Sequence, residues 1–234
     1  TVDHVIDGVR SDHHHLSLRH YLHYRYRVYL LSMVLLIIPA NVHLAFRFLP
    51  DQMLYSGIII SCFVMLYLLL IPFMKKLKKW PIKEGLVALG VTAGMCFLPA
   101  TGGKLEWHFT YILLLLVFSM INFLNLMIFS LLDEEDDRRS SMPSIVQYYG
   151  AERSGEIANG LVVLTFFVLG IWLYTFQGVE KSHATVVFML MLNILALILL
   201  KREYFVKNNL FRFWGDSIYL VPGLIQALFV EKLI

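Results

Sequence analysis

Residues 107–132 read WHFTYILLLLVFSMINFLNLMIFSLL, and residues 133–139 continue as DEEDDRR. The first stretch contains no Asp, Glu, Lys or Arg. As a helix rising about 1.5 Å per residue, it would cross the roughly 30 Å of hydrocarbon in a bilayer. The second stretch is charged throughout. This junction predicts a membrane-crossing helix that ends at an aqueous face lined with carboxylates.

The rest of the 234-residue chain has the same apolar character. Apolar residues make up 58% of it, against about 45–50% in soluble domains, and charged residues make up 16%, against about 25%. Because too little polar surface remains to cover a water-soluble globule, we expect an integral membrane protein. The small net charge of +3 argues against a nucleic-acid-binding protein. Cys62 and Cys96 lie inside apolar runs, which argues against a disulfide framework or a Cys-based metal site.

Seven apolar stretches are each about long enough to cross a bilayer as a helix. β-Barrel strands would be about half as long and would alternate in polarity, so the sequence predicts an all-α, polytopic transmembrane helical bundle. No internal repeat or long linker divides the chain, so we expect residues 1–234 to form a single domain. The predicted helices cover residues 28–49, 53–74, 83–100, 107–132, 157–176, 184–200 and 214–231.

The basic residues predict the orientation of this bundle. If the N-terminal segment is cytoplasmic, sixteen of the twenty Lys and Arg residues fall on the cytoplasmic side. The opposite side then carries only Arg47, Lys104, Lys181 and Lys232. We therefore expect a multi-pass protein whose acidic stretch faces the cytoplasm. Residues 1–10, TVDHVIDGVR, look like the last turn of a helix, so we also expect that an N-terminal portion is missing or has been removed by processing.

Two pairs of Asp residues, each spaced by four, lie on the predicted cytoplasmic side. On a continuing helix Asp133 and Asp137 would project from the same side, as would Asp3 and Asp7. Paired carboxylates beside a membrane cavity can hold Mg²⁺, and two facing pairs could hold two metal ions around a diphosphate. The alternative for Asp133 and Asp137 is a solvated helix end that carries a mixed cluster of charges.

Asn122 is a candidate cavity residue within the fourth predicted helix. It precedes Asp133 by eleven residues, which is close to three helical turns, so it should point into the same cavity about 16 Å deeper. Asn125 is less well aligned. The alternative for Asn122 is an interhelical hydrogen bond, which is the more common role of an amide inside a membrane helix.

Residues 133–150, DEEDDRRSSMPSIVQYYG, resemble the second aspartate-rich motif of the UbiA superfamily of intramembrane prenyltransferases, approximately D-x-x-x-D-R-x-x-G-x-x-T-L-x-x-x-x-G. Asp133, Asp137 and Arg138 match it without a gap, and Gly150 falls on the closing Gly. Ser141 replaces the usual Gly.

Two further segments are similar to elements of this family. The family's first motif reads N-D-x-x-D; here Asp3 stands in the Asn position and Asp7 matches the second Asp, so the motif is degenerate. Residues 71–85, IPFMKKLKKWPIKEG, are similar to the short Lys/Arg-containing loop before the family's fifth helix. The resemblance covers essentially the whole chain, and it implies nine helices in the complete protein, about two of them before Thr1.

The resemblance also implies a reaction and its site residues. The reaction would be the Mg²⁺-dependent transfer of an isoprenyl group from an isoprenyl diphosphate to a lipophilic, usually aromatic, acceptor. We expect the protein to lie in a bacterial inner membrane, in contact with membrane lipid. The catalytic metal ligands would be Asp7, Asp133 and Asp137, with Asp3 as a further candidate. Candidate diphosphate contacts are Arg138, Lys78, Lys79 and Arg19, for which the alternative is a purely topological role.

Two other functions compete with this one. The degenerate first motif and Ser141 suit a non-catalytic UbiA-like subunit, which would act as a scaffold or lipid-binding component of a larger membrane-protein complex. A transporter or channel is the weaker alternative, because no charge near the middle of an apolar stretch marks an ion pathway.

Overall fold

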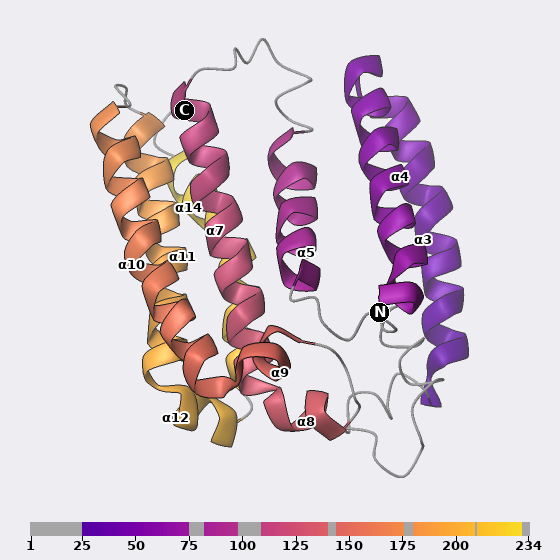
Figure 1. Cartoon of the computed structure of the whole chain (residues 1–234). Coiled ribbons are helices and arrows are strands. Elements are labelled where there is room, and N and C mark those ends of the chain that lie inside the picture. The colour runs from indigo at the N-terminus through magenta and orange to yellow at the C-terminus, as the bar shows by residue number, and fades with distance from the viewer. Residues whose placement is uncertain are drawn as a thin grey trace.

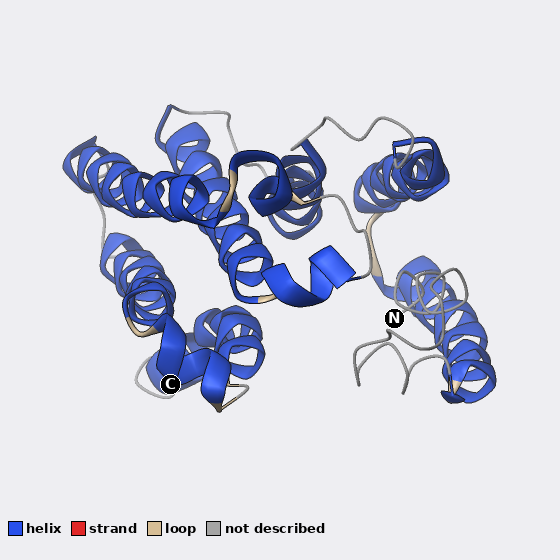
Figure 2. Cartoon of the chain, turned by 60° about the horizontal axis from the view of Figure 1, so that its bottom comes forward, coloured by secondary structure: helices blue, strands red, loops and turns tan. Residues whose placement is uncertain are grey.

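The computed structural model describes residues 25–74, 82–97, 109–139, 144–175, 180–208 and 210–230. All the regular secondary structure in these ranges is helical (Figures 1 and 2), which confirms the predicted all-α class. Within the described residues, three helices are long and apolar enough to cross a membrane, namely Arg27–Phe48, Tyr111–Leu132 and Ala151–Thr175. These three helices suggest a membrane protein. Membrane crossing by the other apolar stretches stays a prediction.

Helices lie over all seven of the apolar stretches marked in the sequence. Short helices in the described connections are α8 (Glu134–Arg139), α9 (Ile145–Tyr149) and α12 (Arg202–Lys207). The long elements are α3 (Arg27–Phe48), α4 (Asp51–Met74), α5 (Ile82–Thr92) with the π-helical turn η2 (Ala93–Phe97), α7 (Phe109–Leu132), α10 (Ala151–Thr175), α11 (Glu180–Leu200), and α13 (Phe211–Ser217) followed by the 3₁₀ turn η3 (Ile218–Leu220) and α14 (Val221–Val230).

Three of the predicted helices begin clearly earlier in the structure. The fifth begins at Ala151 rather than at residue 157, because the polar turn AERSGE continues the helix. The sixth begins at Glu180 rather than at residue 184. The seventh begins at Phe211 rather than at residue 214, and η3 interrupts it. Hydropathy misses such ends because backbone hydrogen bonds form a helical turn whatever the polarity of its side chains.

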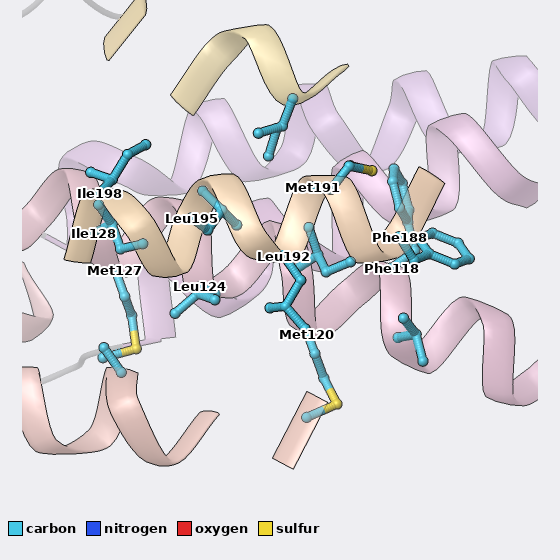
Figure 3. Close-up of a cluster of buried hydrophobic side chains, with 14 of the residues drawn as sticks. Phe118, Met120, Leu124, Met127, Ile128, Phe188, Met191, Leu192, Leu195 and Ile198 are labelled. Carbon is cyan, nitrogen blue, oxygen red and sulfur yellow. The ribbon is translucent and has the colours of Figure 1, made fainter. Parts of the chain in front are cut away.

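Helix α7 is the centre of the described bundle, and α5, α10, α11 and α13 pack against it (Figure 1). Val117, Ile121, Leu124 and Ile128, which recur every three or four residues, are completely buried. Figure 3 shows Leu124 and its neighbours on α7 in one cluster with α11 residues such as Leu195. In a membrane such helices associate through close packing and interhelical hydrogen bonds, because lipid tails are as apolar as the side chains.

Helices α3 and α4 lie at one edge of the described bundle (Figure 1). No residue of α3 is buried, and its large apolar side chains are exposed, for example Leu36 at 75%. A helix that is apolar all round is typical of a membrane span.

Candidate functional site

Asp133 lies where α7 ends and α8 begins. Helix α7 ends at Leu132 and α8 begins at Glu134, although the Asp133 backbone N–H still donates to the Phe129 carbonyl oxygen. Asp133 and Asp137 are expected to project from the same side only on a continuing helix. The chain bends at Asp133, so this condition is not met. The spacing of four consequently does not fix how the two carboxylates face each other.

Asp133 forms an ion pair with Arg212 of α13, a residue 79 positions later. The Nη2 atom of Arg212 donates to Asp133 Oδ2. The Asp133 side chain is 14% exposed and that of Arg212 is 32% exposed. Charge-assisted bonds of this kind are stronger than neutral ones. The sequence-predicted metal ligand is thus compensated by a cation that had been counted only for membrane topology.

The packing of α13 on α7 holds Arg212 over Asp133. The Phe211 ring is buried, and its centroid lies 6.2 Å from that of Phe129, which is one turn before Asp133. A Cβ atom at Gly215 would lie 2.5 Å from the Phe129 ring, closer than real Cβ contacts allow. The absence of a side chain at Gly215 therefore permits the close approach of the two helices.

Glu84 of α5 contributes a buried carboxylate at the same end of the bundle. Its Oε1 atom accepts hydrogen bonds from the Ser130 hydroxyl at 3.2 Å and from the Ile145 backbone N–H at 3.0 Å. Its Oε2 atom is buried and has no hydrogen-bond partner in the described part of the chain. Ser130 and Ile145 flank residues 131–144, which we call the acidic segment because it carries Asp133 and Asp137. One carboxylate therefore connects the two ends of the acidic segment.

A second polar cluster lies deeper in the bundle and contains Asn122. The Asn122 amide donates to Thr92 Oγ1 of α5 at 2.9 Å, and its carbonyl oxygen accepts from the Tyr219 hydroxyl of η3 at 2.9 Å. Asn125 also contacts this hydroxyl, at 3.5 Å. These bonds are the interhelical role weighed as the alternative for Asn122. Both Asn122 and Asp133 bond to the α13–η3 segment, as residues three turns apart on one helix should.

The other predicted site residues are placed only in part. Arg138 is exposed on α8, and the side chain of Asp137 is outside the described residues. Asp3, Asp7, Arg19, Lys78 and Lys79 lie wholly outside them. Within the described ranges no group of three or more His, Cys, Asp or Glu side chains could hold a metal ion. Asp133, the one described ligand candidate, offers the oxygen donors that Mg²⁺ prefers.

A cavity of about 1130 Å³ opens beside the acidic segment, among the ends of α7, α8, α10, α11 and α12. Its apolar lining includes Ile128 and Leu131, and five of its lining residues are glutamates. Asp133 does not line this cavity. The cavity is lined, however, by Leu132 and Glu134, the residues on either side of Asp133. Its charged lining residues are Glu134, Glu135, Glu152, Glu156, Arg202, Glu203 and Lys207.

No family model matches the chain, and no curated protein or solved structure matches it significantly. The resemblance to the UbiA superfamily therefore rests on the sequence motifs alone.

Sequence reasoning missed Glu84, Arg212 and Tyr219. It also missed Thr92 and Ser130, which hydrogen-bond to Asn122 and Glu84, respectively. Glu84 could have been found, because a carboxylate within an apolar stretch marks a polar contact. It also begins the series Glu84, Ala88 and Thr92, which forms the buried face of α5. Nothing local in the sequence distinguishes Arg212 from the other basic residues at helix ends, or Tyr219 from the other aromatic residues.

Proposed function

We propose that this protein is a membrane prenyltransferase of the UbiA type. It transfers an isoprenyl group from an isoprenyl diphosphate to a lipophilic, aromatic acceptor. The observation that best supports this function is the end of α7. There an apolar helix runs directly into the second aspartate-rich motif, and a cation from α13 lies beside its first carboxylate, Asp133.

The chain's residues divide the chemistry between them. Mg²⁺ would be held by Asp3, Asp7, Asp133 and Asp137, and it would supply positive charge to the diphosphate leaving group. When the bond between the isoprenyl carbon and the diphosphate oxygen breaks, negative charge grows on the diphosphate oxygens. Fixed cations then stabilise that charge in a site partly shielded from water. Arg138, Lys78, Lys79 and Arg19 provide these cations at the predicted cytoplasmic face, and the apolar helix surfaces accommodate the isoprenyl tail.

The proposal includes a membrane arrangement. The seven apolar stretches cross a bacterial inner membrane, the complete protein has about nine helices, and the acidic segment faces the cytoplasm. The sixteen-to-four distribution of Lys and Arg supports this orientation. The exposed apolar surface of α3 supports contact with lipid.

The test is the binding of a non-hydrolysable isoprenyl thiodiphosphate to the longest form of the protein, purified in detergent, with and without Mg²⁺. We expect saturable binding that requires Mg²⁺ and weakens at least about tenfold in Asp137→Asn, as for the loss of a charged ligand. Asp51→Asn is the matched control, because Asp51 is an exposed carboxylate in the first turn of α4. It should bind like the wild type.

Well-folded wild-type protein that binds no thiodiphosphate would contradict the proposal. The alternative hypothesis, a non-catalytic UbiA-like subunit, would then be favoured. It predicts stable co-purification with other membrane proteins.

A further inference from the structure

Arg212 has unused capacity to bind an anion. A guanidinium carries five N–H donors in a planar fork that matches carboxylate and phosphate oxygens. Within the described residues Arg212 makes one hydrogen bond, from Nη2 to Asp133 Oδ2. A third of its side chain is exposed, so an anion can reach part of it.

Arg212 is also held in place by its neighbours in the sequence. Phe211 before it is buried against Phe129, and Gly215 after it lets α13 contact α7 closely. The described part of the chain contains no other Lys or Arg paired with a predicted metal ligand. Arg138 is exposed on α8, while Arg202 and Lys207 line the cavity beside the acidic segment.

Charge balance indicates what Arg212 does when the site is loaded. A divalent cation held by Asp133 would repel the guanidinium that pairs with the same carboxylate. An anion that contacts both cations removes this repulsion, and the diphosphate of the proposed donor is such an anion. We propose that Arg212 is a diphosphate-binding residue, which pairs with Asp133 in the unloaded site and with phosphate oxygens in the loaded one. This inference rests on the proposed function and adds to it a residue that neither motif assigns.

The proposal predicts opposite effects on two ligands. Without diphosphate, Arg212 competes with Mg²⁺ for Asp133, so Arg212→Gln should bind Mg²⁺ alone at least as tightly as the wild type does. At saturating Mg²⁺, Arg212→Gln should bind both inorganic diphosphate and an isoprenyl thiodiphosphate about 10- to 100-fold more weakly, the usual effect of losing a charged hydrogen bond. Arg212→Lys keeps the positive charge but lacks the planar fork of N–H donors. Its affinity for both diphosphates should lie between those of the wild type and Arg212→Gln.

The experiment uses the full chain in detergent and measures all three affinities by calorimetric titration, together with the thermal unfolding midpoint. Arg202→Gln is the matched control, since it removes the same charge from an exposed site on the neighbouring helix α12. Its affinities for both diphosphates should stay within about twofold of the wild type.

Each other outcome overturns the inference in a recognisable way. Diphosphate binding by Arg212→Gln within threefold of wild type excludes Arg212 as a contact but leaves the proposed function intact. A parallel loss of Mg²⁺ binding, diphosphate binding and thermal stability indicates a purely structural ion pair. If Arg212→Gln binds the isoprenyl thiodiphosphate more weakly but inorganic diphosphate as tightly as the wild type does, Arg212 does not contact the phosphate oxygens. If Arg212→Gln does not fold, unchanged binding by Arg212→Lys excludes recognition by the guanidinium fork. A wild-type protein that binds neither diphosphate contradicts the proposed function itself.

Discussion

The Oε1 atom of Glu84 lies 3.0 Å from the backbone nitrogen of Ile145, 61 residues further along the chain. The same oxygen accepts the Ser130 hydroxyl from α7. A single carboxylate from α5 thereby fixes both ends of the acidic segment. The position of the acidic segment thus depends on a residue that lies outside it.

Replacing Glu84 with alanine should destabilise the protein. Glu84→Ala leaves the Ile145 N–H and the Ser130 hydroxyl without an acceptor, which should lower the free energy of unfolding by about 1–3 kcal/mol. Glu84→Gln retains an acceptor oxygen and should lower it less. Chemical denaturation in detergent micelles measures both. Glu156→Ala, at an exposed carboxylate of α10, should change stability by no more than about 0.5 kcal/mol. Equal stability of the Glu84→Ala and Glu156→Ala variants would show that the two hydrogen bonds do not matter.

Gly215→Ala should separate α13 from α7. The added methyl group would lie 2.5 Å from the Phe129 ring and 2.9 Å from Asn125 Oδ1, so the ring must move and disturb its contact with Phe211. Overpacking of this kind costs about 1–3 kcal/mol. Gly160→Ala is the control, because a Cβ atom there meets nothing within 4 Å and alanine favours the helix by up to about 1 kcal/mol. Thermal unfolding should therefore shift in opposite directions for the two variants.

Tyr219→Phe should uncouple the deeper polar cluster. It removes the hydroxyl that donates to Asn122 Oδ1, and interhelical hydrogen bonds in membrane proteins contribute about 0.6 kcal/mol on average and up to about 1.7. A double-mutant cycle with Asn122→Ala should give a coupling energy in this range. Tyr174→Phe serves as the control, since Tyr174 is 89% exposed. A coupling energy indistinguishable from zero would mean that the 2.9 Å contact contributes nothing to stability.

The proposed orientation predicts which helix ends face the cytoplasm. The test uses a variant in which Cys62 and Cys96 are replaced by alanine. In spheroplasts of cells that express it, the added substitution Asp51→Cys should give a cysteine that reacts with a membrane-impermeant maleimide. A cysteine at Lys207 should react only after the membrane is permeabilised. Both positions are exposed in the structure, so a lack of reaction reports topology rather than burial. The reverse pattern of labelling would place the acidic segment on the other side.

Hydropathy was enough to locate the long apolar helices but not the short helices α8, α9 and α12, and α7 shows why. A long uncharged stretch such as residues 107–132 leaves its backbone polar groups only one way to be satisfied inside hydrocarbon, which is an uninterrupted helix. The break at Asp133 was not predictable from spacing. Helical periodicity relates the side chains of two residues only while the helix continues between them. It does not predict where one helix ends and the next begins.

The partners of the site residues were equally out of reach of the sequence. Asn122 could be assigned to the face of α7 that carries Asp133, because both positions follow from the helical repeat. That this face meets Tyr219 and Arg212 depends on how α13 crosses α7, which the missing side chain at Gly215 and the packing of Phe211 on Phe129 permit.

The sequence by itself determined the all-helical class, the apolar stretches and the acidic segment at the end of α7, because these follow from local polarity and backbone hydrogen bonding. Only the tertiary structure decided that Arg212 neutralises Asp133 and that Glu84 connects the ends of the acidic segment. The Asp133–Arg212 contact joins residues 79 positions apart, and the two contacts of Glu84 join residues 46 and 61 positions apart. All three depend on the close packing of whole helices. Long-range contacts of this kind leave no periodic signal in the chain.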